Sequence, residues 1–164
     1  MKQDLGFYDY WPYENRPKIQ WPGGAKLAFW VAPNIEYYEL DPPQNPFRKA
    51  WPQPTPAVAG YSIRDYGNRV GHSRQMQLLD KYGIRGSVSL STALCDHHPE
   101  IIKQCRDLDW EFFSHGIYNT RYTYGMTEDQ EREMIRDSIK SIFKHTDQKC
   151  AGYLAPALSH SELT

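Results

Sequence analysis

Apolar and polar positions alternate along the chain with two different periods, and short apolar runs mark the candidate strands. Residues 26–32 form a nearly continuous apolar run, which is typical of a strand that is buried on both faces. Further short runs occur at residues 86–91, 110–114 and 151–154, and each has the length of a strand. The pattern therefore predicts about four strands.

Helical signals separate these runs. Residues 70–82 carry apolar side chains near one face of a helix, and a glycine follows them as a stop signal. Pro99 is suited to the first position of a second helix, because its missing N–H is not needed there. Thr127 and Gln130 form a capping box, which predicts a third helix that ends near Lys144.

Strands and helices thus alternate along the chain. Alternation at this spacing predicts parallel strands that are joined by right-handed helical crossovers. The fold class is therefore α/β, as a barrel or an open sheet. Before this region, residues 1–25 form an arm rich in Pro, Trp and Tyr, and residues 34–60 read as a Pro-rich insertion, because proline disfavours helices and central strands.

Length, composition and charge limit the kinds of molecule with which this chain is expected to interact. The chain has 164 residues and 40% apolar content, which is enough for one packed domain. Its 19 basic and 20 acidic residues give a net charge of −1 without a block of like charges, so we expect no nucleic acid partner. The longest apolar run, residues 27–33, is too short to span a membrane, and the first residues lack a secretory pattern.

The three cysteines, at positions 95, 105 and 150, are widely spaced and contain no pair typical of zinc or redox sites. Reduced thiols are the simplest interpretation, and they predict a cytoplasmic protein.

Polar residues follow the expected strands at the end where ligands bind in parallel α/β folds. Asn34 and Glu36 come after the first strand and share one side of an extended backbone. His115 and Asn119 follow the third strand, and Pro156 follows the fourth. We therefore expect these residues to form one site.

The same segments resemble the motifs of the polysaccharide deacetylase family, which is also called the nodulation-type deacetylase domain. Residues 34–36 (Asn-Ile-Glu) stand where the family has Asp-x-Asp or Asp-Asp, and residues 114–119 (Ser-His-Gly-Ile-Tyr-Asn) where it has Ser-His-x-x-x-His. Residues 152–156 (Gly-Tyr-Leu-Ala-Pro) are similar to its Arg-x-Pro segment, with leucine in place of arginine. Residues 64–71 (Arg-Asp-Tyr-Gly-Asn-Arg-Val-Gly) resemble the allantoinase and cyclic-imide-hydrolase branch most closely.

The resemblance implies a (β/α) barrel that hydrolyses carbon–nitrogen bonds other than peptide bonds. Residues 26–164 would form its N-terminal half only, a partial barrel with about four parallel strands that is truncated before closure, since a closed barrel needs about 250 residues. Such a sheet would have unpaired strand edges. We therefore expect a homo-oligomer, or a second chain that completes the barrel.

The resemblance also implies a divalent metal held by one Asp and two His, with a second Asp as base, and this sequence departs from that set. A neutral amide such as Asn34 cannot accept a proton near neutral pH, and Asn119 is a poor zinc ligand. We therefore expect no cofactor. The alternative is a zinc ion held by Glu36, His115 and Asn119.

Without a metal, Glu36 is the expected general base on water, and His115 would bind the carbonyl or protonate the leaving nitrogen. Asn34 and Asn119 would orient the substrate, with Tyr66 and Pro156 as further contacts. Base catalysis contributes about 10²–10⁴-fold, which suits an activated cyclic amide or ureide.

Two points stay open. Arg64 and Arg69 either grip substrate carbonyl oxygens or form surface ion pairs. The function itself has two alternatives to a cyclic amidase: a metal-dependent carbohydrate N-deacetylase, and a non-catalytic fragment that pairs with another chain.

Overall fold

The computed structural model describes residues 9–43 and 56–164 and is built around a parallel sheet. Strands β1 (Asn34–Ile35), β2 (Ser87–Leu90) and β3 (Glu111–Ser114) lie in the order β1-β2-β3, with both pairings parallel. The helices are α1 (Val58–Tyr66), α2 (His72–Lys81), α3 (Leu94–His97), α4 (Pro99–Asp107) and α5 (Glu128–Thr146). A π-helical turn (Gly67–Gly71) joins α1 to α2, and 3-10 turns occur at Tyr13–Asn15, Pro22–Gly24 and Pro156–Leu158.

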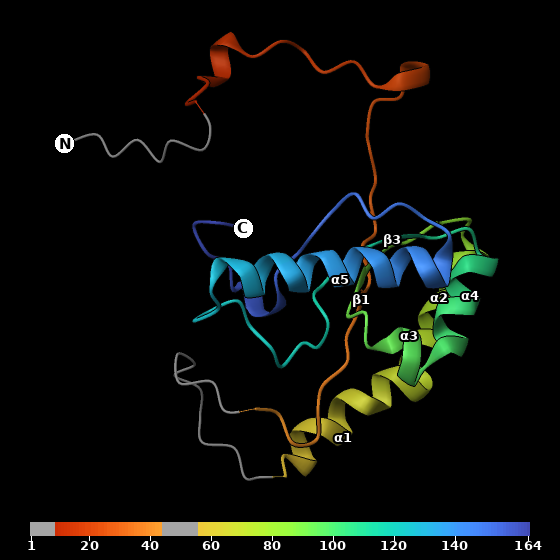
Figure 1. Ribbon diagram of the computed structural model, residues 1–164. Helices are drawn as coiled ribbons and strands as arrows, with labels where there is room; N and C mark the ends of the chain where they lie inside the picture. The colour runs from red at the N-terminus through yellow and green to blue at the C-terminus, as the bar shows by residue number, and fades with distance from the viewer. Residues whose placement is uncertain (1–8, 44–55) are drawn as a thin grey trace.

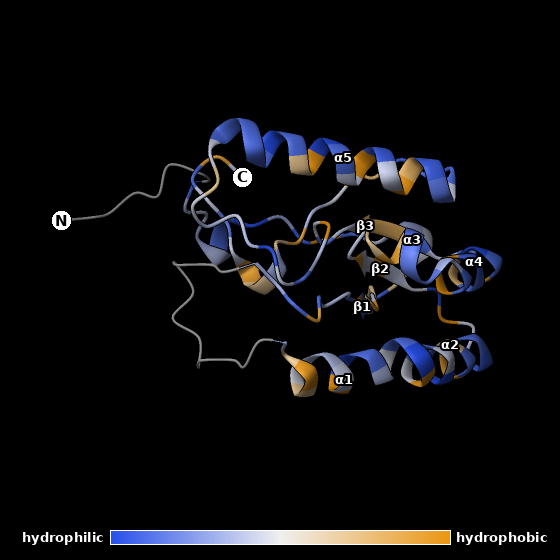
Figure 2. Ribbon diagram, turned by 60° about the horizontal axis from the view of Figure 1, so that its bottom comes forward, coloured by the Kyte–Doolittle hydropathy of each residue, from blue (hydrophilic) through white to orange (hydrophobic). Residues whose placement is uncertain are grey.

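Helices flank the sheet on both sides. Figure 2 shows α5 beyond β3 and the α1–α2 pair beyond β1, with the strands between them. Apolar side chains from the strands and the facing helices meet in one core, whose most deeply buried members include Ile35, Val88, Leu90, Leu94, Cys105, Trp110, Phe112 and Ile142. The α/β fold with parallel strands and an unclosed sheet is therefore as the sequence predicts.

The first strand lies later in the chain than residues 26–32, where the sequence placed it. Val31 makes only an isolated bridge to Gly86, and the continuous ladder begins at β1. Pro33 explains the displacement: its carbonyl accepts a hydrogen bond from the Ser89 N–H at 2.9 Å, but it has no N–H to donate in return. The ladder is therefore interrupted at the proline.

The expected fourth strand is present only as a bridge. Tyr153 pairs in parallel with Ser114, whose N–H and C=O bond Gly152 and Leu154 at 2.9 Å each. The described residues thus form three strands and two isolated bridges, and the sheet does not close.

The helices with strong local signals begin where they were expected. Pro99 opens α4, and the Thr127–Gln130 capping box opens α5. The expected helix at residues 70–82 is instead the second part of a longer helical segment that starts at Val58, so α1 was missed, as was the short α3.

The chain before β1 leads away from the sheet. In Figure 1 it is the red to orange trace that runs from the top of the view down to β1. Leu27, Phe29 and Trp30 are exposed along it. The expected arm at 1–25 and insertion at 34–60 fall partly outside the described residues. Within the described ranges, no helix is long and apolar enough to cross a membrane.

Candidate active site

Glu36 and His115 meet at the carboxyl ends of β1 and β3, the two strands that flank β2. The register pairs Ile35 with Leu90 and Leu90 with Ser114, so the next residues along the outer strands, Glu36 and His115, reach the same rim. His115 Nε2 lies 3.4 Å from Glu36 Oε1, with the imidazole only 5% exposed and the carboxylate side chain 26% exposed. The sequence predicted this proximity from the position of both residues directly after strands of one parallel sheet.

The His115 ring is held in one orientation by the chain after β3. Its Nδ1 lies 2.7 Å from the carbonyl oxygen of Leu154. A carbonyl only accepts, so Nδ1 must carry the hydrogen, and Nε2 is the atom that faces Glu36. A second proton on the ring therefore sits at Nε2, directed toward the carboxylate.

The Glu36 carboxylate is bound on both oxygens. Oε2 accepts from the Tyr38 hydroxyl at 2.9 Å and from Asn119 Nδ2 at 3.0 Å, while Oε1 faces His115. The hydrogen bond with His115 contributes most to lowering the pKa of Glu36; burial opposes it, and Tyr38 and the nearby Arg64 cation lower the pKa further. Glu36 is therefore ionised at neutral pH, which is the form a general base needs.

Asn119 presents a free acceptor next to this carboxylate. It is 5% exposed, and its Nδ2 donates to Glu36 and to the Tyr38 hydroxyl. Its Oδ1 is buried and has no partner among the described residues. A buried unpaired acceptor costs free energy, and a substrate N–H would satisfy it.

Asn68 and Tyr38 contact Glu36, although the sequence did not place them in the site. Asn68 Nδ2 donates to the Glu36 backbone carbonyl oxygen at 3.1 Å, and the Tyr38 hydroxyl donates to the carboxylate. For Tyr38, the signal was its period-two spacing from Asn34 and Glu36. The guanidinium of Arg64, which the sequence left open as a site residue, lies 4.3 Å from the centroid of the Tyr38 ring.

The comparisons with known proteins settle the family. The polysaccharide deacetylase model matches residues 59–164, which include β2, β3 and His115. The chain belongs to the polysaccharide deacetylase family. No curated protein matches it significantly.

Solved structures agree with the fold of this deacetylase-family chain. A probable polysaccharide deacetylase from Pseudomonas aeruginosa is 25% identical, with a TM-score of 0.66 over 85% of this chain and 50% of that one. PuuE allantoinase is 23% identical, with a TM-score of 0.66 over 89% and 53%. A CE4 family pseudoenzyme from Bacillus anthracis is 16% identical, with a TM-score of 0.57 over 82% and 37%. The chain thus spans 37–53% of the length of these structures.

The family's metal set does not fit the residues present here. Glu36 and His115 lie 3.4 Å apart, and no group of three His, Cys, Asp or Glu side chains that could hold a metal ion gathers in residues 9–43 and 56–164. Asn119 turns its Nδ2 toward the carboxylate, so an N–H occupies the direction from which a third ligand would coordinate.

The remaining expected substrate contacts, Asn34, Arg69 and Tyr66, are all exposed. Asn34 is exposed in β1, two residues before Glu36. Arg69 is 67% exposed and pairs with Asp65, and Tyr66 is exposed with its hydroxyl accepting from Arg74 at 3.5 Å. The structure therefore does not bring Arg69 and Tyr66 to the Glu36–His115 pair.

Pro156 supports the site from beneath and is not on its surface. It is fully buried, and its Cγ lies 3.0 Å from the point where a Cβ on Gly116 would stand. Gly116 has φ of +71°, which only glycine adopts easily, and it directly follows His115. The contact that the sequence assigned to substrate is thus a packing contact that positions the His115 loop.

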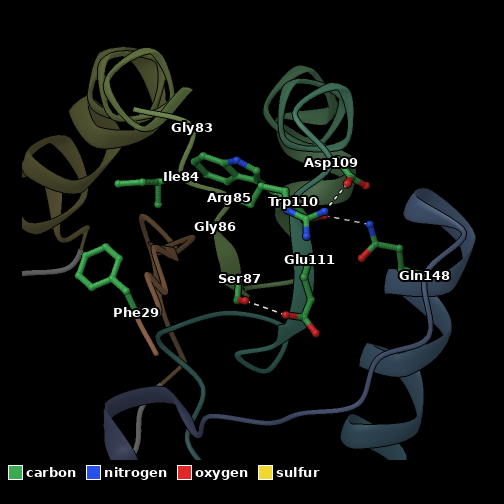
Figure 3. Close-up of a pocket in the computed structure, with 10 residues that line it drawn as sticks. All are labelled: Phe29, Gly83, Ile84, Arg85, Gly86, Ser87, Asp109, Trp110, Glu111 and Gln148. Carbon is green, nitrogen blue, oxygen red and sulfur yellow. Dashed lines mark hydrogen bonds and ion pairs between the residues drawn. The ribbon is translucent and has the colours of Figure 1, made fainter. Parts of the chain in front are cut away.

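A large cavity lies at the opposite end of the sheet. Its volume is about 740 Å³. Figure 3 shows the residues that line it at the amino ends of β2 and β3, among them Phe29 and Trp110. Its polar groups are already paired, as in the Ser87–Glu111 hydrogen bond of 2.7 Å. Ligands of parallel α/β folds bind at the other end, so the rim with Glu36 is the better candidate.

Proposed function

We propose that this chain carries the catalytic base and acid of a hydrolase that opens cyclic amides or ureides with water, without using a metal. The observation that supports it most directly is the Glu36–His115 pair, 3.4 Å apart at the strand-end rim, with the unpaired Asn119 Oδ1 beside it. Family membership supports the coarser class, a hydrolase of carbon–nitrogen bonds.

Each of these three residues has a defined part in the reaction. Glu36 takes a proton from water, whose oxygen attacks a ring carbonyl carbon. As the ring C–N bond breaks, His115, which enters the cycle protonated on both ring nitrogens, gives its Nε2 proton to the leaving nitrogen. Glu36 then returns its proton to His115 across the gap between them, so both groups recover. Asn119 Oδ1 accepts a ring N–H and orients the substrate.

The modest rate enhancement that acid and base catalysis supplies favours a cyclic amide as the substrate. General acid and base catalysis contributes about 10²–10⁴-fold per group, which is enough for a strained or activated cyclic amide. An N-acetyl group on a sugar is less reactive and needs stronger polarisation of its carbonyl, as a Lewis acid supplies. The donor set around Glu36 does not suit such an ion.

A second candidate is a metal-dependent carbohydrate N-deacetylase, favoured by the 25% identity to the probable polysaccharide deacetylase. Assays after dialysis against a chelator separate the two. We expect turnover of succinimide or hydantoin to survive the dialysis, and no release of acetate from an N-acetylglucosamine oligomer. Zinc-dependent acetate release would overturn the proposal in favour of the deacetylase. Absence of both activities would favour a non-catalytic chain.

The lowered pKa of Glu36 predicts a pH dependence of stability. A carboxyl group whose folded pKa lies below its unfolded value, about 4.3, stabilises the fold above that value. This contribution is lost as the pH falls through the folded pKa. Wild type should therefore be more stable than Glu36→Gln at neutral pH, and the difference should shrink in acid. Urea unfolding of both proteins between about pH 7 and pH 3 measures it; a difference that does not change with pH would contradict the prediction.

A further inference from the structure

We propose that Arg64 binds the acyl oxygens at the reacting carbon, and that its ligand is the carboxylate which ring opening creates. This inference rests on the proposed function and adds a specificity-determining residue to the same site. Arg64 lies in the last turn of α1, and its guanidinium carbon stands 4.3 Å from the centroid of the Tyr38 ring. The hydroxyl of that ring donates to Glu36 Oε2 at 2.9 Å. Arg64 is thus one side chain away from the general base.

The hydrogen-bonding state of Arg64 differs from that of its neighbour. Arg69 gives its guanidinium to Asp65, and Arg121 gives its own to Glu39 at 2.7 Å. Arg64 Nη1 donates to the Gly60 carbonyl at 3.2 Å, and the guanidinium also hydrogen-bonds the Tyr38 side chain, but no carboxylate in residues 9–43 or 56–164 forms an ion pair with it. The structure thereby separates the two arginines that the sequence left open: Arg69 forms a surface ion pair with Asp65, whereas Arg64 lies beside the site with no carboxylate partner among the described residues.

Ring opening generates a carboxylate, the group that a guanidinium such as that of Arg64 binds well. Hydrolysis of a neutral cyclic imide breaks one C–N bond, adds the water oxygen to the carbonyl carbon and leaves a carboxylate there after loss of its proton. A guanidinium matches the two oxygens of a carboxylate as a planar fork. Stacking on Tyr38 also restricts the arginine before binding, which reduces the entropy lost when the ligand arrives.

A structural role for Arg64 makes a different prediction. If Arg64 only supports Tyr38 through the stacked contact, its loss should weaken binding of the neutral ring and binding of the ring-opened acid equally. If Arg64 binds the carboxylate, its loss should lower the affinity for the ring-opened acid and leave the affinity for the neutral ring nearly unchanged. Succinimide and succinamate, the anion of the acid that forms when one molecule of water opens the ring, therefore serve as the probes.

The test is calorimetric titration of both compounds into the wild-type protein and into Arg64→Gln and Arg64→Lys. We expect Arg64→Gln to lose about 10–100-fold in succinamate affinity, the size of a charge-assisted hydrogen-bonded contact, and much less in succinimide affinity. Arg64→Lys should recover part of the loss because it keeps the charge without the fork. Arg132→Gln is the matched control, since Arg132 pairs with Glu128 on the surface of α5 and should leave both affinities unchanged.

Three results would overturn the inference: equal losses for both compounds in Arg64→Gln, no loss in that variant, or no binding of succinamate by the wild-type protein. Failure of the proposed function looks different. A protein that binds succinamate through Arg64 but never opens succinimide would retain the binding residue and lose only the hydrolase proposal.

Discussion

Replacing Glu36 with glutamine should lower kcat for succinimide hydrolysis by about 10²–10⁴-fold, the range that general base catalysis contributes. Glutamine has nearly the same shape and can still accept at its carbonyl oxygen from the Tyr38 hydroxyl or from Asn119 Nδ2. It cannot take a proton from water near neutral pH. The loss should therefore appear in the chemical step, and single-turnover rates of both proteins measure it.

A matched carboxylate outside the site controls for the change of charge. Glu100 lies in the first turn of α4 and is exposed, so Glu100→Gln should retain the wild-type rate. Succinamate titration then shows whether the Glu36→Gln site is still formed, because Arg64 is unaltered in that variant. If Glu36→Gln turned over succinimide at the wild-type rate, Glu36 would not be the base.

The elements that the sequence predicts correctly are those with local signals. The Thr127–Gln130 capping box and Pro99 specify helix starts through hydrogen bonds and backbone angles close to them in the chain. The start of α1 at Val58 lacks such a signal: no side chain caps it, and glycines at 60 and 67 weaken the helical pattern. The first strand was misplaced because hydrophobicity does not report the missing N–H of Pro33.

The proximity of Glu36 and His115 follows from topology, since all strands of one parallel sheet bring their carboxyl ends to one rim. Topology does not, however, say whether Arg64 or Arg69 lies beside the site. Five residues along a regular helix turn the side chain by about 140°, so one arginine at most faces a given site, and the sequence does not say which. A π-helical turn begins at Gly67, between the two positions, and changes the spacing further. The side-chain direction had to come from the structure.

Pairing of this chain with a second copy or another chain stays a prediction. The observations that bear on it are the open sheet and the exposed side chains of Leu27, Phe29 and Trp30 before β1. Exposed apolar side chains next to unpaired strand edges are the features that further strands would cover.

Replacing Trp110 with alanine should produce the largest loss of stability, about 3–5 kcal/mol of unfolding free energy. Trp110 is 1% exposed, and its Cε3 lies 2.8 Å from the position of a Cβ on Gly86, so the ring packs directly on the backbone that leads into β2. Its carbonyl also accepts from Gln148 Nε2 at 2.9 Å, which ties the chain after α5 to the start of β3. The alanine variant would leave a cavity there that a rigid sheet cannot close.

Tyr82→Ala is the control for loss of an aromatic ring, because Tyr82 is 65% exposed and should change stability by less than about 1 kcal/mol. Urea unfolding of both variants gives the comparison, with a lower midpoint and an unchanged slope expected for Trp110→Ala. Equal midpoints for the two variants would show that the Trp110 ring does not hold the strands together. Trp110 lies at the amino end of β3 and His115 follows the other end of the same strand, so the variant should keep its catalytic rate per folded molecule. The two substitutions thus separate the end of the sheet that stabilises the fold from the end that carries the chemistry.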